Sequence, residues 1–365
     1  SVAAVRHGAT DELGQVAFTS QNHGGPIKLN PAYFQRLDQR ITAINDAGLV
    51  AAHVLIWSLT DHDPGKYLSE KDIIQLVRYQ IARYGAHHVV WILAGDNRYN
   101  EQTASRWKRV GRAVFGDGPH APVTTHPTGM NWPWEDWRDE KWLDILGYQS
   151  GHGDSAKSLA WIHSGPVHRN WRRHKKRPII NLEPPYEDII AYQSRKPHSA
   201  YNVRRAVYWS LLCAPTAGVT YGGHGMWSWQ TVEDVARNHE RFGVAKVWHE
   251  AKDLPGALDM QRMAEFFTSE RWWTLKPAGE LLSTQPGRKD PSRFVAVSRS
   301  DDGDLVVAYL PVGGEVAFSQ SITALGLGSM RWFDPRTGRF EAAKPRDGRR
   351  FTAPDNTDWM LVLKR

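Results

Sequence analysis

Short apolar runs alternate with amphipathic helical stretches from about residue 13 to residue 230, and this alternation restricts the fold more than any other feature of the chain. The runs are rich in β-branched and aromatic residues, as expected of buried strands. Strands and helices that alternate at this spacing are typical of βα units around a parallel sheet. We expect seven strands, at residues 13–19, 49–57, 88–95, 121–125, 142–149, 177–183 and 217–222.

The stretches between these strands predict amphipathic helices. In residues 31–47, the apolar side chains of Phe34, Leu37 and Ile41 fall on one helical face. Ser69 and Asp72 give another helix a start that resembles a capping box. The helices predicted in this way cover residues 31–47, 69–84 and 199–213.

The strand count is compatible with two architectures. One is an open doubly wound sheet, but no glycine-rich phosphate loop follows the first predicted strand. The other is a (β/α)8 barrel, which needs eight strands and about 250 residues. Either residues 1–12 supply an irregular first strand, or a preceding piece is absent from this chain, and we favour the second. We therefore expect an α/β fold, a (β/α)8 TIM barrel whose first βα unit is missing or truncated.

The character of the chain changes near residue 293. Short strands at close spacing, separated by turns such as Asp302-Gly303 and Gly313-Gly314, predict an all-β module. A stretch rich in Pro and Gly at residues 276–289 marks the boundary. We expect a barrel domain over residues 1–280 and a small C-terminal β-sandwich over residues 290–365.

Composition limits the class of protein. Of 365 residues, 41% are hydrophobic and 23% are charged, which is ordinary for a soluble globular protein. No run approaches the roughly 18 consecutive apolar residues of a membrane span, so we predict no membrane insertion. No signal peptide is visible, although one could have been removed. The single cysteine, Cys213, excludes a disulfide framework within the chain and is assigned to core packing.

Charge and tryptophan content bear on possible partners. Much of the net charge of +7 comes from residues 168–177, which could be a nucleic-acid groove or attract an acidic polysaccharide. A solvated helix end is the simpler interpretation, and we predict no nucleic-acid partner. The 17 tryptophans are unusual. Indole faces stack well on sugar rings, although tryptophan is also a large core residue.

Two predicted strands end on a carboxylate. Residues 88–95 lead into Asp96, and residues 177–183 end on Glu183. The carboxyl ends of parallel strands are where active sites lie, and two acids placed there are the minimal equipment of a glycosidase. They could also be two unrelated structural groups. Glu187 competes with Glu183, but two prolines separate them and resist extension of the strand, so we expect Glu187 on a loop or a first helical turn.

Other strand ends are rich in His, Tyr, Gln, Asn and Trp, which suits a hydroxyl-rich ligand. His126, His152 and His224 could suggest a metal site. They follow different strands, however, and none has His-Glu-x-x-His spacing, so we predict neither a metal nor a cofactor. Hydrogen bonds from Asn181, Tyr148 or His224 could keep Glu183 ionised. The predicted substrate-binding residues are Trp57, Asn97, His126, Tyr148, Gln149, His152, Tyr221, His224 and Trp227.

Several motifs, taken in chain order, resemble the apiosidase-like glycoside hydrolases, a bacterial group often labelled collagenase-like. The tail Trp332-Phe333-Asp334-Pro335 resembles the small C-terminal β-domain, with a collagen-binding name, that accompanies these enzymes. The resemblance covers nearly the whole chain. Its motifs are Asn30-Pro-x-Tyr-Phe, Tyr79-x-x-x-Arg83-Tyr84-Gly85, Trp91-Ile-Leu-Ala-Gly-Asp96, Thr125-His126-Pro127, Tyr148-Gln149-Ser150-Gly151-His152, Asn181-x-Glu183-Pro184 and Tyr221-Gly222-x-His224-Gly225-x-Trp227.

The resemblance implies a retaining glycosidase in which Asp96 is the acid/base and Glu183 the nucleophile, with carboxyl groups about 5–5.5 Å apart. It also implies an oligo- or polysaccharide substrate from plant or bacterial cell walls, apiose being one of several sugars, and a secreted or periplasmic location. The family's usual opening strand, with its Asp-Thr-Ala-Trp-like segment, is not found here. The oligomeric state is not predicted.

Two alternatives stay open. The chain could be a non-catalytic carbohydrate- or matrix-binding protein on a degenerate barrel. It could also be the metalloprotease that the collagenase label suggests, although the absence of His-Glu-x-x-His argues against this.

Overall fold

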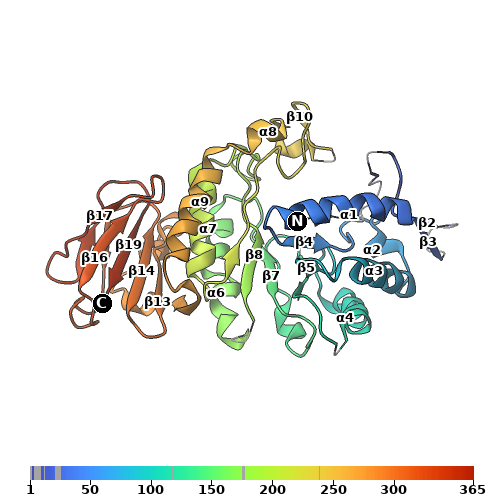
Figure 1. Ribbon diagram of the computed structural model, residues 1–365. Coiled ribbons are helices and arrows are strands. Elements are labelled where there is room, and N and C mark those ends of the chain that lie inside the picture. Colours follow the sequence, from blue (N-terminus) through green and yellow to red (C-terminus); the bar gives the residue numbers. More distant parts are fainter. Residues whose placement is uncertain are drawn as a thin grey trace. The chain divides into compact units, whose positions relative to one another are not determined.

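The computed structural model describes residues 2–3, 10–11, 13–20, 26–116, 118–174, 177–237 and 239–365 (Figure 1). The chain divides into two compact units, residues 1–148 and residues 149–365. Among the described residues, no helix is both long enough and apolar enough to cross a membrane.

A parallel sheet forms the centre of the first unit. Its strands lie in the order β1 (Val2–Ala3), β4 (Ala51–Val54), β5 (Val89–Ile92) and β6 (Val123–Thr124). The predicted strands at residues 49–57, 88–95 and 121–125 are therefore confirmed in shortened form. A further strand, β7 (Leu146–Gln149), lies at the boundary of the two units and corresponds to the one predicted at 142–149.

The helices of the first unit follow the predicted pattern. Helix α1 buries Phe34, Leu37 and Ile41 on one face. The Ser69 hydroxyl accepts a hydrogen bond from the Asp72 amide, which confirms the predicted start of α3. The helical elements are α1 (Pro31–Asp46), α2 (Pro64–Tyr67), α3 (Glu70–Tyr84), α4 (Glu101–Phe115) and the 3-10 turn η1 (Trp134–Trp137).

The strand predicted at residues 13–19 is wrong in extent and partner. Only β2 (Phe18–Ser20) is extended, and it pairs in antiparallel fashion with β3 (Ile27–Leu29), outside the parallel sheet. The reason is exposure: Leu13 is 67% exposed, whereas strands of a parallel sheet are covered on both faces. The sheet instead begins with β1, so a strand does come from residues 1–12, as one of the two alternatives expected. Residues 1, 4–9 and 12 lie outside the described part of the chain.

Strand β8 (Ile179–Glu183) is the first complete strand of the second unit. It pairs in parallel with β9 (Gly218–Val219), which confirms the strands predicted near 177–183 and 217–222. Helix α7 (Ala200–Leu212) confirms the helix predicted at 199–213, and it opens with a capping box between Ser199 and Asn202 that was not predicted. The other elements before the C-terminal sheet are α5 (Ala156–Ser164), α6 (Pro166–Asn170), η2 (Trp171–His174), β10 (Asp234–Val235), η3 (Glu240–Phe242), β11 (Val244–Ala245), α8 (Trp248–Ala251), α9 (Pro255–Thr268) and η4 (Trp272–Thr274).

The basic segment at residues 168–177 runs through α6 and η2 toward β8. Arg169, Arg172 and Arg173 are exposed. Lys175 and Lys176, which contribute to its predicted charge, lie outside the described residues.

A six-stranded antiparallel sheet forms the C-terminal part of the second unit, as the strand-rich sequence predicted. Its order is β12 (Leu275–Pro277), β13 (Ala296–Ser300), β14 (Leu305–Leu310), β19 (Trp359–Lys364), β16 (Ser329–Phe333) and β17 (Phe340–Ala342). A second antiparallel pair consists of β15 (Glu315–Ala317) and β18 (Arg350–Thr352). Three short 3-10 turns connect these strands: η5 (Gly279–Leu281), η6 (Pro286–Arg288) and η7 (Pro291–Arg293).

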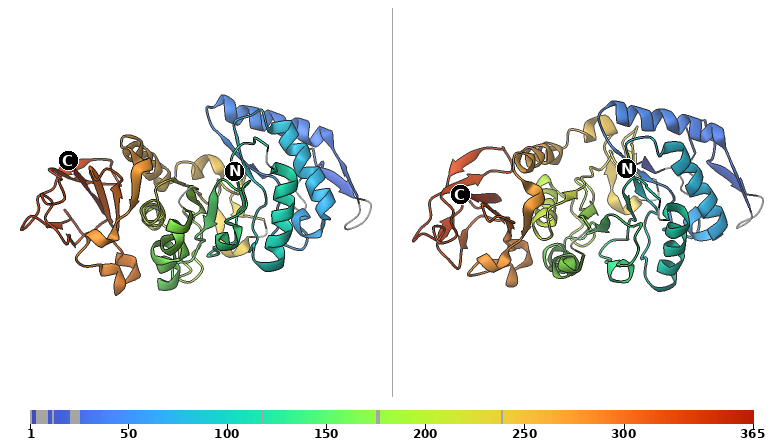
Figure 2. Two further views of the ribbon diagram at one scale, coloured as in Figure 1. Left: turned by 90° about the horizontal axis from the view of Figure 1, so that it is seen from below. Right: turned by 60° about the horizontal axis from the view of Figure 1, so that its bottom comes forward.

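Both faces of this sheet are covered. On one face, the sheet lies against the helices of its own unit (Figure 2), and residues of β14 and β19 share a hydrophobic core with α7 and α9. Within this core the rings of Tyr208 and Tyr309 stack 4.7 Å apart. On the other face, Val306 and Leu361 belong to a second core that includes Phe351 of β18. The sheet therefore lies between the helices of its own unit and a thin second β layer.

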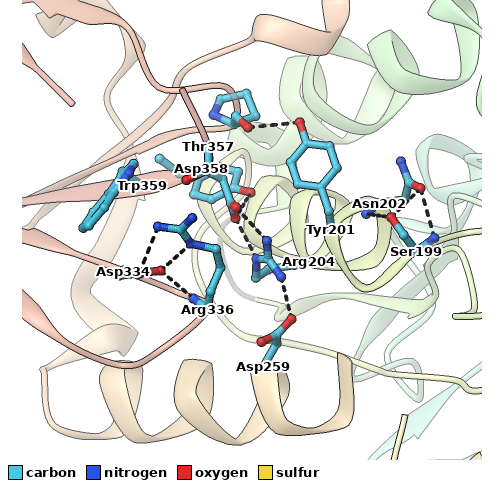
Figure 3. A network of polar contacts seen from close by, with 12 residues as sticks. Ser199, Tyr201, Asn202, Arg204, Asp259, Asp334, Arg336, Thr357, Asp358 and Trp359 are labelled. Carbon is cyan, nitrogen blue, oxygen red and sulfur yellow. Dashed lines mark hydrogen bonds and ion pairs between the residues drawn. The ribbon is translucent and has the colours of Figure 1, made fainter. Parts of the chain in front are cut away.

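A buried arginine joins these helices to the sheet (Figure 3). The Arg204 guanidinium of α7 donates two hydrogen bonds to the Asp358 carboxylate, at 2.6 and 2.7 Å, and a third to Asp259 of α9 at 2.5 Å. The Tyr309 hydroxyl donates to the same Asp358 carboxylate at 2.9 Å. All three charged side chains are almost fully buried. Removal of one partner therefore leaves an uncompensated charge in the interior.

We expect Arg204→Ala to lower the free energy of unfolding by about 3–5 kcal/mol, because Asp259 and Asp358 lose their common counter-charge. Urea unfolding followed by circular dichroism measures this change. Arg262→Ala is the matched control, because Arg262 pairs with the same Asp259 from a more exposed position, and we expect a loss of about 0–1 kcal/mol. Equal losses in the two variants would contradict the assignment.

Candidate active site

Asp96 follows β5 on a backbone held by its neighbours. The Gly95 amide donates to the Ile56 carbonyl at 2.8 Å, and the His126 amide donates to the Ala94 carbonyl at 3.0 Å. A side chain at Gly95 would place its Cβ 2.1 Å from the Trp57 ring, so glycine is required for Trp57 to lie against the chain. Trp57, a predicted sugar-binding residue, thus packs directly against the backbone next to Asp96.

Tyr99 holds the same backbone from the other side. Its hydroxyl lies 2.8 Å from the Ala94 carbonyl and 2.5 Å from the Gly95 carbonyl, and the side chain is fully buried. Tyr99 has a φ of +52°, a costly conformation for a bulky residue. Burial, and to a lesser degree the Asp96 charge, raises its pKa well above the usual value, so the hydroxyl stays a donor. Sequence reasoning missed Tyr99, because nothing in its spacing predicts a left-handed backbone.

His126 is the hydrogen-bond partner of Asp96. Its Nδ1 lies 2.9 Å from the Asp96 Oδ1, and the two rings of Trp57 and His126 meet edge to face, 6.4 Å apart. If Asp96 is ionised, His126 donates the proton. If Asp96 is protonated and His126 is neutral with its proton on Nε2, the carboxyl group donates to Nδ1 instead. The pair can therefore hold Asp96 in either protonation state.

Two further predicted binding residues of the first unit, Asn97 and Tyr148, are buried. The Asn97 amide nitrogen donates to the Ser58 hydroxyl at 2.9 Å, which joins the loops after β4 and β5. Tyr148 is buried in β7, with its ring 6.2 Å from that of Trp132.

His152 is the partner of Glu183. Its Nε2 lies 2.8 Å from the Glu183 Oε1, and its Nδ1 accepts a hydrogen bond from the Tyr186 amide at 3.4 Å. An Nδ1 that accepts cannot carry the proton of a neutral imidazole, so the proton lies on Nε2 and is donated to Glu183. A hydrogen bond donated to a carboxylate favours its ionised form.

Aromatic side chains surround the His152 ring. The rings of Tyr186, Tyr192 and Phe242 approach it edge to face, at 4.8, 5.8 and 5.5 Å. Trp227, predicted to bind substrate, continues this group, with its ring 6.5 Å from that of Tyr186. The imidazole is therefore fixed by packing as well as by hydrogen bonds.

Asn181 and His224 do not take the role suggested for them beside Glu183. The Asn181 side-chain nitrogen donates to the hydroxyl groups of Ser150 and Ser210, at 2.9 and 3.0 Å. The His224 Nδ1 lies 3.2 Å from the Asp188 carbonyl. Within the second unit, His152 donates a side-chain hydrogen bond of the kind that sequence reasoning assigned to these residues.

Glu187 is a buried structural acid. Its Oε2 accepts hydrogen bonds from the Tyr221 hydroxyl at 2.7 Å and from the Gly256 amide, in the first turn of α9, at 2.9 Å. Burial raises the pKa of Glu187, although both hydrogen bonds act in the opposite direction. The Tyr221 hydroxyl, predicted to contact substrate, is occupied by this acid. Glu187 lies on a loop, as expected, and joins it to α9.

Several buried polar atoms of the second unit lack a hydrogen-bond partner among the described residues. Three belong to predicted binding residues: Gln149 Oε1, His224 Nε2 and Trp227 Nε1. A fourth is the Ser228 hydroxyl. Because the His224 Nδ1 donates to a carbonyl group, its Nε2 is an acceptor. Buried polar atoms without partners are rare and call for an explanation, and a hydroxyl-rich ligand can supply both donors and acceptors.

The fold is shared with glycoside hydrolases of known structure. One solved structure, titled only as a glycoside hydrolase, matches with a TM-score of 0.76 and 18% identity over 95% of this chain and 78% of that one. A family 5 glycoside hydrolase from Bacteroides vulgatus ATCC 8482 matches with a TM-score of 0.76 and 19% identity over 95% and 80%. An α-amylase from Geobacillus thermoleovorans, complexed with acarbose, matches with a TM-score of 0.56 and 9% identity over 96% and 88%. No curated protein sequence gave a match.

Family models identify the chain more specifically. Residues 2–274 match the family described as "Apiosidase-like, catalytic domain", and residues 277–364 match "Putative collagen-binding domain of a collagenase". Fold and family place the chain in the class of glycoside hydrolases. It belongs to the apiosidase-like catalytic-domain family, as its sequence motifs indicated.

We expect the stability of Glu187→Gln relative to the wild type to increase as the pH rises above the ordinary glutamate pKa of about 4.5. The pKa of Glu187 is higher in the folded state than in the unfolded state. Between these two pKa values, the stability of the wild type therefore falls as the pH rises, because the unfolded state ionises first. A glutamine keeps an acceptor for Tyr221 and Gly256 but does not ionise. Thermal unfolding of both proteins between pH 4 and pH 8 gives the difference in stability at each pH. A difference that does not change with pH would contradict this assignment.

Proposed function

We propose that the chain is a retaining glycoside hydrolase in which Glu183 is the nucleophile and Asp96 the general acid/base. The observation that carries the proposal is the different hydrogen-bond partner of each strand-end acid. His152 donates to Glu183 and favours a carboxylate that can attack. His126 can hold Asp96 in either protonation state, which suits a group that first donates a proton and then accepts one.

The reaction has two displacements. In the first, the Glu183 carboxylate forms a bond to the anomeric carbon while the bond to the leaving oxygen breaks and Asp96 gives that oxygen its proton. In the second, Asp96 removes a proton from water, whose oxygen replaces Glu183 on the same carbon. Family membership and the histidine partners support these roles, and the mechanism requires the two carboxyl groups about 5–5.5 Å apart.

The proposed substrate is a side chain of a plant or bacterial cell-wall polysaccharide. Support comes from the family, whose name refers to apiose release, and from the buried polar atoms of Gln149, His224 and Trp227 that lack partners in the described chain. We further propose that residues 1–280 form the catalytic domain and residues 290–365 an accessory β-domain, and that the enzyme acts outside the cytoplasm.

We expect Asp96→Ala and Glu183→Ala each to lower kcat by about 10²–10⁴-fold or more, because each removes a group that reacts in the transition state. Azide should restore turnover differently in the two variants. In Asp96→Ala it attacks the glycosyl-enzyme and gives a glycosyl azide of retained configuration, whereas in Glu183→Ala it replaces the nucleophile and gives the inverted azide. Proton NMR of the products distinguishes the two anomers.

Asp63→Asn serves as a control, because Asp63 is a buried carboxylate that accepts backbone hydrogen bonds from Leu59 and Thr60 at the start of α2. Its kcat should change far less than that of either active-site variant. An inverted product from the wild-type enzyme would contradict retention. Full activity in either active-site variant would exclude that residue from the proposed role, and a wild type without activity on any glycan would favour the binding-protein alternative.

We expect His152→Phe to move the acidic limb of the pH profile of kcat/KM to higher pH, because Glu183 loses a donor to its ionised form. Phenylalanine keeps the edge-to-face packing with Tyr186 and Phe242, so folding should be retained. His163→Phe, at a buried histidine that stacks on Phe294, is the control and should leave the profile unchanged. An unshifted acidic limb in His152→Phe would show that His152 does not set the charge of Glu183.

A further inference from the structure

Trp229, which is exposed, and Trp248, which is partly buried, form a stacked pair on the second unit. Their rings lie 4.7 Å apart at an interplanar angle of 6°, so the two indoles are nearly parallel. Trp229 is nevertheless 60% exposed. Because Trp248 covers one face of the Trp229 indole, this exposure leaves the other face open. An open indole face on a rigid base is an uncommon surface for a soluble protein, and such apolar patches often mark binding sites.

The backbone fixes this pair at a cost. Trp229 has a φ of +51°, which is an unfavourable backbone conformation for a bulky side chain. The Trp229 amide donates to the Met226 carbonyl at 3.1 Å. The Trp248 amide donates to the Gln230 carbonyl at 2.8 Å, which ties the two tryptophan-bearing segments together. The conformation is therefore held by specific contacts, and strain of this kind clusters at functional sites.

Two exposed valines lie within four residues of the pair in the sequence. Val232, and Val244 at the start of β11, are also exposed. Trp248 is the first residue of α8, which lies close to β10 in the ribbon (Figure 1). We call Trp229, Trp248, Val232 and Val244 the tryptophan platform.

The platform is continuous in the chain with the candidate site. The loop after β9 carries His224 and Trp227, with their unpartnered buried polar atoms, and reaches Trp229 only two residues beyond Trp227. A polymer chain bound by this loop can therefore extend from groups that need hydroxyl partners to the stacked indole rings of Trp229 and Trp248.

We propose that the tryptophan platform binds a sugar ring of a polysaccharide at a position removed from the bond that is cleaved. The C–H face of a pyranose ring is flat and apolar, whereas its hydroxyl groups point outward and stay hydrated. An open indole face can stack on the C–H face of the ring and leaves the hydroxyl groups in water, so the platform needs no polar side chains. The identity of the polymer rests on the proposed function, but binding to the platform does not require catalysis.

Affinity electrophoresis tests the proposal. The inactive variant Glu183→Gln is run in native gels that contain soluble xyloglucan, arabinoxylan or rhamnogalacturonan, alone and combined with Trp229→Ala and Trp248→Ala. We expect at least one polymer to retard the parent, and the Kd from the concentration series to rise at least tenfold in the tryptophan variant. Trp229→Phe with Trp248→Phe should restore most of the binding, which shows that an aromatic face is needed.

Trp273→Ala is the matched control, because Trp273 is 63% exposed but lies in the turn η4, away from the platform in sequence. It should bind as the parent does. Equal retardation of the parent and of the variant with Trp229→Ala and Trp248→Ala, or no retardation by any polymer, would overturn the proposal. So would a sedimentation experiment in which the alanine variant loses self-association while polysaccharide binding is unchanged, since the platform would then contact a second copy of the chain.

These outcomes separate the platform from the catalytic proposal. If the wild-type enzyme hydrolyses no glycan but the variant with Trp229→Ala and Trp248→Ala binds polysaccharide more weakly than its parent, the platform is supported and the enzyme assignment fails. If hydrolysis depends on Glu183 but binding is the same with and without the two tryptophans, the enzyme assignment is supported and the platform fails.

Discussion

A histidine hydrogen-bonded to each strand-end acid is the interaction on which this site depends. Asp96 is paired with His126, and Glu183 with His152. The two pairs differ in one respect that governs their chemistry. The His152 Nδ1 accepts a hydrogen bond from the Tyr186 amide, so its Nε2 must donate to Glu183. The His126 ring contacts Asp96 through Nδ1, which can either donate to Asp96 or accept from it. This difference supports the proposed roles, in which Glu183 is ionised while Asp96 is protonated.

Helix α9 links this chemistry to the C-terminal sheet. Its first turn binds the Glu187 carboxylate through the Gly256 amide, and this holds the loop that follows β8. One turn later, Asp259 pairs with Arg204, which in turn binds Asp358 at the edge of β19. Buried charges in this network are stable only while all partners are present. The strand-rich region therefore does more than follow the catalytic region in sequence, since it completes the core in which α7 and α9 are fixed.

Much of this arrangement could be predicted because it depends on local patterns. The strand that precedes Asp96 and the strand that ends at Glu183 come from continuous apolar runs, and the cap of α3 is a short side-chain motif. Residues 13–17 misled the prediction, because Leu13 and Val16 stay exposed there and no local signal distinguishes that case. Tyr99 and the Glu187–Gly256 contact also escaped prediction. One depends on a strained backbone and the other joins residues 69 positions apart.

Trapping of the covalent intermediate tests the central claim most directly. The Asp96→Asn variant should still form the glycosyl-enzyme from a substrate with a good leaving group, but water would attack it slowly. Intact-mass analysis followed by peptide mapping should then show one glycosyl unit attached to the peptide that contains Glu183, and no such adduct when Glu183 is glutamine. A glycosyl adduct on another residue, or steady hydrolysis without any adduct, would contradict the assignment of Glu183 as the nucleophile.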